Sequence, residues 1–384
     1  YLGASIRMNI LITGAHGFIA RNLIHVLQSK ELSFLQPLKL YTYDRRDAIE
    51  DLKEYLTDCD FIIHLAGVNR PQKAQEYEEG NKGFTQFICD ELIQHRNTCP
   101  ILMTSSIQAV LDNDYGRSKR AAENCLRSLW QKNGNKIYLY RLPNVYGKWC
   151  RPDYNSVVAT WCYHLARNQD IQIHDEQKEI TLCYIDDVIT EILNCLQGKA
   201  TVADESDFYK VEPTTRCRLS ELRNILYSFK NEQQNLTLPN QTAFVKKLYA
   251  TYLSYLPQEN LSYSLTMHQD ARGSFTEMFH MDTYGQVSVN VLHPGIVKGN
   301  HWHMSKNEKY VVVAGEGNVK LRNLYDDDHK LLTYHLSANK MEVVDIPPGY
   351  LHCIENTGTQ DMVVIIWANE VFDETYPDTY YKEV

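Results

Sequence analysis

The chain has 384 residues, of which 43% are hydrophobic and 23% charged, and its formal net charge is −9. At about 150 residues per domain, this length predicts two or three domains. The composition excludes a mainly disordered, collagen-like or coiled-coil chain. The acidic balance argues against binding to nucleic acid or to anionic membranes, because affinity for both comes from basic surfaces.

The sequence also predicts a cellular location. No apolar run approaches the roughly 18 residues that span a bilayer, and no secretory signal is visible. The ten cysteines are scattered and form no CxxC pair, so we expect reduced thiols and a cytoplasmic protein. The seven residues before Met8 read as a tag remnant (1–7) and are left out of the fold prediction.

Strand-like and helical segments alternate along the first 255 residues. A helical pattern from residue 18 to about 30 follows the first apolar run, and residues 150 to about 255 are mostly helical. This alternation predicts an α/β Rossmann-type domain, in which helices cover both faces of a parallel sheet. The apolar runs that predict its strands are residues 8–13, 38–43, 61–65, 101–105 and 137–142.

The pattern changes near residue 260, after a connecting segment at residues 231–256. Short runs rich in Val, Ile, Tyr and Thr are now separated by Gly, Pro, Asn and Asp. These features predict an all-β domain, either a sandwich or a jelly-roll barrel. Its clearest strands are residues 286–292, 310–314, 319–324, 341–346 and 362–367.

A glycine-containing turn follows the first predicted strand. Gly14 and Gly17 lie between this strand and the next helix, and Ala20 takes the third small-residue position. Such a turn lets the pyrophosphate of a dinucleotide approach the backbone at a helix N-terminus; the alternative is an ordinary strand-to-helix turn.

The second predicted strand is followed by three charged residues, Asp44, Arg45 and Arg46. The carboxylate of Asp44 could bind the 2′-hydroxyl of the ribose in NAD, whereas an arginine accommodates the 2′-phosphate of NADPH. Two consecutive arginines favour NADPH. The alternative is a charged turn that is exposed to solvent.

Tyr115 and Lys119 lie four residues apart in a predicted helix and therefore share one face. A neighbouring cation favours the phenolate and lowers the pKa of a tyrosine from about 10, so Tyr115 can act as a proton donor to an alkoxide. The preceding strand ends at Ser105-Ser106, whose hydroxyls can bind a substrate carbonyl. The sequence leaves open which of the two serines is catalytic.

These motifs resemble the extended short-chain dehydrogenase/reductase family over residues 8–255, with a substrate-binding part at about residues 149–230. The segment Arg141 to Gly147 is similar to the family's R-x-x-N-x-Y-G, which implies that Asn144 contacts a nucleotide-sugar substrate. The resemblance implies catalytic roles for Ser105 or Ser106 with Tyr115 and Lys119. The residues it implies for cofactor binding are Gly14, His16, Gly17, Phe18, Ile19, Asp44, Arg45, Arg46, Leu65, Ala66, Gly67, Tyr115 and Lys119.

Four residues of metal-ligand type occur in the C-terminal region. His301 and His303 alternate on one predicted strand, so both point to the same face, and Glu308 and His352 follow. Three histidines and a carboxylate suit zinc, iron, nickel or manganese. The spacing resembles the two motifs of the cupins, although the second motif lacks its leading glycine.

The segment from Asp270 to Glu277 resembles the D-x-R-G-x-F-x-E entry of the deoxysugar-nucleotide 3,5-epimerases, which are also cupins. The resemblance implies substrate contacts from Arg272 and Glu277; an internal ion pair is the alternative. Those enzymes have a catalytic base at the position of His301 and lack a metal. If His301 binds a metal, the base must be another group: a nearby tyrosine or histidine, or a water bound to the metal.

Nearly the whole chain resembles the CapF/WbjC family of capsule and O-antigen biosynthesis, with a cupin domain at residues 262–384. This implies a homodimer that uses NADPH and zinc. Its substrate would be a UDP-linked 4-keto-6-deoxy amino sugar, UDP-2-acetamido-2,6-dideoxy-4-keto-L-hexose. The cupin would epimerise C3 and the reductase would reduce C4, giving the L-talose product on the route to UDP-N-acetyl-L-fucosamine. Two alternatives are a 4-ketoreductase whose cupin serves only for dimerisation or sugar binding, and a non-catalytic NADPH sensor.

Overall fold

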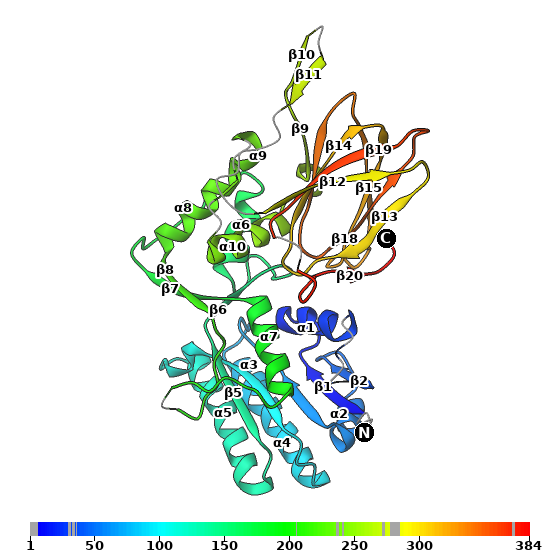
Figure 1. The fold of residues 1–384 in the computed structure, drawn as a ribbon. Helices are drawn as coiled ribbons and strands as arrows, with labels where there is room; N and C mark the ends of the chain where they lie inside the picture. Colours follow the sequence, from blue (N-terminus) through cyan, green and yellow to red (C-terminus); the bar gives the residue numbers. More distant parts are fainter. Residues whose placement is uncertain are drawn as a thin grey trace. The chain divides into compact units, whose positions relative to one another are not determined.

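The computed structural model describes residues 7–29, 32, 35, 37–204, 206–235, 238–239, 242–270, 273–276, 285–370 and 373–384. Contacts divide the chain into two compact units (Figure 1). Unit 1 consists of Tyr1–Val145 and Thr181–Arg216, and unit 2 of Tyr146–Ile180 and Cys217–Val384. No helix in the described part of the chain is long and apolar enough to cross a membrane.

Unit 1 contains a five-stranded parallel sheet in the order β2-β1-β3-β4-β5. Leu11 joins a buried cluster with side chains of α2, α4 and α5, whereas Ile10 and Ile12 point to the opposite face and are also fully buried. Burial on both faces explains the near-continuous apolar run in β1. The strands are β1 Met8–Thr13, β2 Leu38–Tyr43, β3 Phe61–His64, β4 Ile101–Ser106 and β5 Ile137–Leu142.

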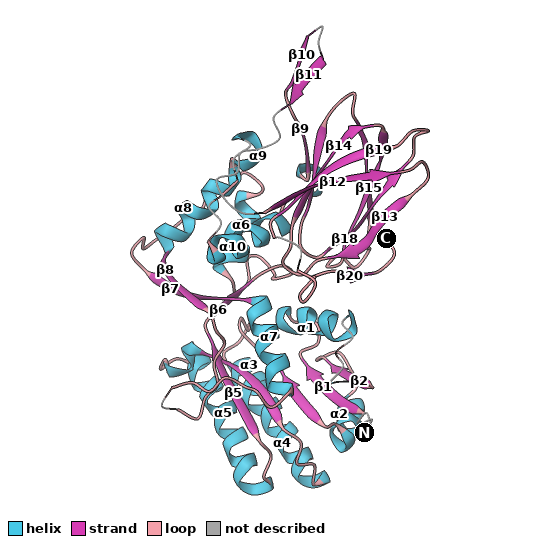
Figure 2. Ribbon diagram, viewed as in Figure 1, coloured by secondary structure: helices cyan, strands magenta, loops and turns pink. Residues whose placement is uncertain are grey.

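The helices of unit 1 follow the strands in the predicted alternation (Figure 2). α1 and α7 pack against each other. The helical segments are α1 Phe18–Ser29, α2 Ile49–Asp58, α3 Gln75–Tyr77, the π-helix Glu78–Gly83, α4 Phe84–His95, the 3-10 helix Ile107–Val110, α5 Asp114–Asn133 and α7 Ile185–Leu196. The strand order reverses between β1 and β3, and the carboxyl ends of strands at such a point form the ligand crevice of open α/β sheets.

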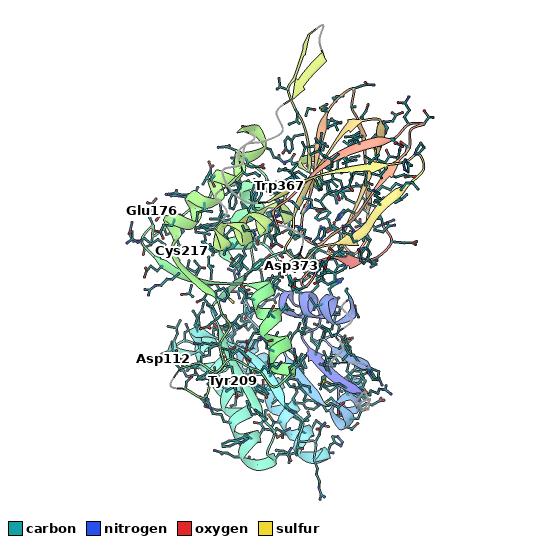
Figure 3. All side chains as sticks on the ribbon, viewed as in Figure 1. Asp112, Glu176, Tyr209, Cys217, Trp367 and Asp373 are labelled. Atoms are coloured by element: carbon teal, nitrogen blue, oxygen red, sulfur yellow. The ribbon has the colours of Figure 1, made fainter. Side chains whose placement is uncertain are left out.

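The β-rich part of unit 2 consists of two five-stranded antiparallel sheets, ordered β12-β19-β14-β17-β9 and β16-β15-β18-β13-β20. Trp367 of β19, labelled in Figure 3, is fully buried. The predicted Rossmann-type domain followed by an all-β cupin is therefore confirmed. The strands are β9 Ser262–Ser264, β12 Gln286–Leu292, β13 Val297–Trp302, β14 Glu308–Ala314, β15 Glu316–Asn323, β16 Leu331–Ser337, β17 Glu342–Ile346, β18 Tyr350–Asn356, β19 Met362–Ala368 and β20 Tyr380–Tyr381.

Unit 2 also contains four α-helices within the described residues. The ring of Phe229 packs on Tyr249 and Tyr252, which joins α8 to α10. These helices belong to the same compact unit as the β-rich sheets. The sequence-based prediction places them in the reductase domain, at residues 8–255. The helices are α6 Val157–Leu165, α8 Leu219–Lys230, α9 Glu232–Asn235 and α10 Ala243–Ser254, with the 3-10 helix Gln258–Asn260.

The described residues also form two smaller sheets. The first consists of β6 Asn144–Tyr146, β7 Glu179–Tyr184 and β8 Thr214–Arg218. The second is a hairpin of β10 Met267–Asp270 and β11 Gly273–Thr276.

Candidate active sites in the two units

The glycine turn after β1 touches the loop after β3. Gly14 has a φ of +69°, and a Cβ added to it would lie 2.8 Å from the Cα of Ala66. Only glycine tolerates both this backbone conformation and this approach. The amide of Ala66 donates to the hydroxyl of Thr13 over 3.3 Å. A backbone-lined turn at the reversal point of the sheet, followed directly by α1, fits the pyrophosphate of a dinucleotide.

The predicted ribose-binding residues lie beside this turn. A carboxylate oxygen of Asp44 accepts a hydrogen bond from the amide of His16 over 3.4 Å, and Arg45 and Arg46 are exposed after β2. A cavity of about 500 Å³ opens nearby, and its lining includes His16 and Asp47. A carboxylate and two exposed arginines therefore follow β2, at the strand end where the ribose of a dinucleotide binds in folds of this type.

Tyr115 and Lys119 are brought together with the loop after β3. Asn113 caps α5 by accepting from the amide of Gly116 over 2.7 Å, which places Tyr115 in the first turn. The Lys119 ammonium lies 5.7 Å from the centre of the Tyr115 ring, and a Cβ on Gly67 would be 2.9 Å from that ammonium. Burial lowers the pKa of Lys119 to about 8, although the nearby Glu123 carboxylate acts to raise it.

The two serines at the end of β4 face different partners. The hydroxyl of Ser105 donates to the buried carboxylate of Glu123 over 2.6 Å. Glu123 also accepts two hydrogen bonds from Arg141, over 2.9 and 2.7 Å. The half-buried Ser106 accepts from the amide of Gln108 over 3.1 Å, an arrangement in which its own hydrogen can still be donated. Ser105 is thus held in a structural ion-pair network, and Ser106 has the arrangement that suits substrate binding.

Two buried residues in this region, Asn81 and His64, are not among the predicted site residues. Asn81, in the π-helix, bonds the amide of Val68 over 2.9 Å and the hydroxyl of Ser118 over 3.0 Å, so it ties the loop after β3 to α5. His64 lies between the hydroxyls of Thr13 and Thr85, at 2.7 and 2.9 Å. Burial, with a smaller contribution from Lys119, lowers the pKa of His64 to about 3. A neutral histidine therefore connects β1, β3 and α4.

Asn144, the predicted substrate contact, lies at the start of β6. Its side-chain amide donates to the carbonyl of Thr181 over 3.3 Å. The chain then continues to Trp149, whose ring lies 6.2 Å from that of Trp302 on β13. Lys148 is buried, and its ammonium lies 4.8 Å from the Trp149 ring centre. The segment after Asn144 therefore packs against the strand that carries His301.

The four predicted metal ligands converge in unit 2. One ligand atom from each of His301, His303, Glu308 and His352 lies within 4.8 Å of all the others. The Nε2 atoms of His303 and His352 lie 3.4 and 3.3 Å from one oxygen of Glu308. Three histidines and one carboxylate at these separations match the donor set of a divalent transition metal.

The hydrogen bonds of these histidines also fit a metal. The Nδ1 of His303 bonds the carbonyl of Asp378 over 2.6 Å, and that of His352 bonds the carbonyl of Tyr350 over 3.1 Å. A carbonyl only accepts, so each Nδ1 carries a hydrogen, and in the neutral imidazole each Nε2 then presents a lone pair. Both Nε2 atoms are buried without a hydrogen-bond partner. A bound cation could satisfy these lone pairs.

The surroundings of His301 favour its neutral form. Burial, followed by the neighbouring His352 and His303, lowers the pKa of His301 to about 3. The neutral imidazole is the form that binds a metal. The ring of Tyr381 lies 5.9 Å from that of His301, and this tyrosine is 82% exposed. The predicted substrate residues Arg272 and Glu277 lie outside the described residues.

The comparisons with known proteins agree with this two-part architecture. Residues 10–91 and 97–208 match the NAD dependent epimerase/dehydratase family, and residues 268–380 match the polysaccharide biosynthesis C-terminal domain. A UDP-glucuronic acid 4-epimerase from Bacillus cereus is 18% identical, with a TM-score of 0.52 over 65% of this chain and 98% of its own, which shows a shared fold. The chain thus combines a short-chain dehydrogenase/reductase domain with a cupin.

Several relatives and solved structures cover almost the whole chain. A UDP-2-acetamido-2,6-beta-L-arabino-hexul-4-ose reductase from Pseudomonas aeruginosa is 43% identical over 97% of this chain and 98% of its own length. The capsular polysaccharide assembling protein CapF from Staphylococcus aureus is 46% identical, with a TM-score of 0.66 over 98% of this chain and 100% of its own. The chain belongs to the CapF/WbjC family, and the resemblance seen in its sequence is confirmed.

Proposed function

We propose that the chain is a bifunctional nucleotide-sugar enzyme. Its cupin epimerises C3 of a UDP-2-acetamido-2,6-dideoxy-4-keto-L-hexose, and its reductase domain reduces the C4 ketone with NADPH to give UDP-2-acetamido-2,6-dideoxy-L-talose. The observation that carries the proposal is the presence of two separate chemical sites in one chain. One holds Ser106, Tyr115 and Lys119, and the other holds the histidine–glutamate cluster.

The reductase site supplies a proton to the developing alkoxide. The chemistry that a bound NADPH supplies is hydride transfer to the ketone carbon. Ser106 donates a hydrogen bond to the ketone oxygen, and Tyr115 transfers its phenolic proton to that oxygen. The Lys119 ammonium, which lies beside the Tyr115 ring, stabilises the phenolate that remains. We assign cofactor specificity for NADPH to Arg45 and Arg46, which stand exposed at the end of β2.

The cupin site supports removal and return of the C3 proton. The 4-keto group acidifies this proton, and a zinc ion held by the four-ligand cluster would stabilise the negative charge on the enolate oxygen. The residues that would hold the ion are His301, His303, Glu308 and His352. His301 cannot serve as a free base while it is a ligand. We assign proton exchange to a group beside the cluster, and Tyr381 is the candidate because its ring faces His301.

Mass spectrometry of the 4-keto UDP-sugar incubated in D2O tests the two activities separately. Deuterium is expected to enter C3 without NADPH, and the reduced hexose is expected only when NADPH is present. Removal of the metal with a chelator should abolish the exchange, while the reduction of an already epimerised substrate continues. The absence of exchange in the metal-loaded protein would contradict the epimerase assignment.

The second candidate function is that of a single 4-ketoreductase, in which the cupin binds sugar or joins subunits. The observation that favours it is the position of His301 within the ligand cluster, where it is not available as a base. Reduction of the ketone without any C3 exchange would support this alternative. Exchange that disappears in the Glu308→Gln variant would exclude it.

The rate of reduction should fall as the pH rises through about 8. Lys119 has its pKa lowered to about 8 by burial, so it loses its charge above this pH and no longer stabilises the phenolate of Tyr115.

The lowered pKa of Lys119 also affects the stability of the fold. The unfolded chain, with an ordinary lysine pKa of 10.5, binds more protons than the folded chain between pH 8 and 10.5. The contribution of Lys119 to stability therefore rises with pH in that window.

The pH profile of kcat/KM for NADPH, which reports the free enzyme, measures this effect. The Lys119→Arg variant should retain its charge and lose the alkaline limb near pH 8, whatever its absolute rate, because a guanidinium stays protonated. Arg120→Lys, at the next position of the same helix, is the matched control and should keep the wild-type midpoint. An alkaline limb at the same pH in Lys119→Arg would assign the limb to another group.

We also propose a homodimer that is formed through β12, an edge strand of its sheet. Val287, Val289 and Val291 alternate along this strand and are 52%, 62% and 46% exposed, whereas exposed edges are usually protected by charges. A second copy that covers this stripe would bury it. Val289→Glu should convert the protein to a monomer in light scattering, and Val202→Glu, at an exposed valine of unit 1, should not. A dimer that persists in Val289→Glu would place the interface elsewhere.

A further inference from the structure

The segment from residue 373 to 384 lies against the metal cluster, and its central residue is Asp378. This aspartate is only 3% exposed and has a φ of +42°, a conformation that aspartate, asparagine and glycine tolerate better than other residues. One carboxylate oxygen accepts from the amide of Met304 over 2.8 Å. The other accepts from the amides of Ser305 and Lys306, over 3.0 and 2.8 Å, and from the Ser305 hydroxyl over 3.0 Å.

These bonds organise the turn between two ligands. Residues 304–307 connect His303 to β14, which begins at Glu308. Three consecutive amides that converge on one carboxylate fix the path of this turn, and therefore the separation of the two ligand side chains. An ionised acceptor makes such bonds about twice as strong as those between neutral groups.

The same residue also orients one ligand directly. The backbone carbonyl of Asp378 accepts from the Nδ1 of His303 over 2.6 Å, which fixes the ring so that its Nε2 faces Glu308. Second-shell partners of this kind set the tautomer and orientation of a ligating histidine. Asp378 therefore acts on the cluster twice, through its side chain on the turn and through its main chain on the ring.

The residues that follow Asp378 attach to the strand of the other ligand. β20 pairs with β13, with Tyr381 opposite His301 and Tyr380 opposite Trp302. The rings of Tyr380 and Trp302 are 4.9 Å apart, and the amide of Lys382 donates to the carbonyl of Asn300 over 2.9 Å. This pairing starts where the register of β13 shifts, between Gly299 and His301.

We propose that Asp378 is a positioning residue of the metal centre, and that residues 373–384 hold the ligands of β13 and β14 in their binding geometry. The inference rests on the proposed metal site. It predicts that changes at Asp378, which is not itself a ligand, weaken metal binding and alter the coordination geometry. A purely structural role would lower the stability of the fold without changing the spectrum of the bound metal.

The test compares Co²⁺ binding by the full chain in three variants. Asp378→Asn keeps the shape and tolerates the positive φ, but it places an amide against the donors of the turn. Ser305→Ala removes one bond to the same carboxylate and is the milder variant, in case Asp378→Asn does not fold. Asp373→Asn is the control within the segment, because the Asp373 side chain accepts hydrogen bonds from the amide and the hydroxyl of Thr375, inside the segment itself.

Affinity is measured by competition with a chromophoric chelator, and geometry by the visible d–d absorption of Co²⁺. Asp378→Asn should bind Co²⁺ about 10- to 100-fold more weakly than the wild type with a shifted spectrum, and Ser305→Ala about fivefold more weakly. Affinities within twofold of the wild type and an unchanged spectrum in both variants would overturn the proposal. If the wild-type protein itself binds no Co²⁺, that result contradicts the metal site of the proposed function. The role of Asp378 as a positioning residue is then contradicted as well.

Discussion

Replacement of Tyr115 with phenylalanine is expected to slow NADPH-dependent reduction by about 10²- to 10⁴-fold, the usual contribution of a general acid. The ring of phenylalanine fills the same space, so its contact with the Lys119 side chain is preserved and only the proton donor is lost. Deuterium exchange at C3 should continue at the wild-type rate, because it takes place in the cupin. Both rates are measured on the same 4-keto UDP-sugar, by NADPH oxidation and by mass spectrometry.

Tyr77→Phe provides a closely matched control. The ring of Tyr77 lies 5.6 Å from that of Tyr115, and both hydroxyls bond Asn69: Tyr77 donates to its carbonyl over 3.1 Å and Tyr115 to its side chain over 3.2 Å. Loss of a tyrosine hydroxyl near Asn69 is therefore common to the two variants, and only Tyr115→Phe should lose reduction. A reductase that remains active in Tyr115→Phe would remove Tyr115 from the catalytic group.

The parts of the structure that local sequence patterns encode could be predicted. The alternation of apolar runs and helical segments predicts the parallel sheet, because helices cover its faces and bury the apolar side chains of the inner strands. Gly14 could be recognised because only glycine suits its backbone conformation and its contact with Ala66. The two-residue period of a strand predicts that His301 and His303 share a face; His303 lies one residue beyond the end of β13, and the structure brings both beside Glu308 and His352.

Features that depend on distant contacts could not be predicted in this way. The difference between Ser105 and Ser106 arises because Glu123, 18 residues further along, binds one hydroxyl and not the other. Asp378 bonds the turn at Met304, 74 residues away, and an aspartate in a polar C-terminal segment has no distinguishing pattern. The grouping of α8 and α10 with the cupin sheets also lacks a local signal, since an amphipathic helix does not reveal which surface covers its apolar face.

The buried charges around Lys309 give a second large effect. Lys309, on β14 next to the ligand Glu308, is 2% exposed, and its ammonium lies 2.8 Å from Asp345 and 3.0 Å from Glu232. It also donates to the hydroxyl of Tyr263 over 3.1 Å. Asp345 is on β17 and Glu232 is on α9, so one cation connects two neighbouring strands with a helix of the same unit.

Lys309→Met is expected to destabilise unit 2 by about 3–5 kcal/mol, the usual result of removing one partner from a buried ion pair. The methionine fills most of the volume, so the loss comes from two carboxylates left in the interior without a cation. Urea denaturation of the metal-free protein, followed by circular dichroism, measures the change without a contribution from metal binding. Adding Asp345→Asn and Glu232→Gln to Lys309→Met should restore part of the stability, because neutral amides cost less to bury than carboxylates.

Lys320→Met separates this effect from the loss of any lysine in the β-domain. Lys320 pairs with Glu355 over 2.9 Å, but both side chains are about one-third exposed, so its loss should cost no more than about 1 kcal/mol. A Lys309→Met variant as stable as Lys320→Met would mean that Asp345 and Glu232 become neutral or hydrated at little cost. The triple variant distinguishes these cases: a gain over Lys309→Met shows that the unpaired carboxylates caused the loss, and no gain shows that the packing did.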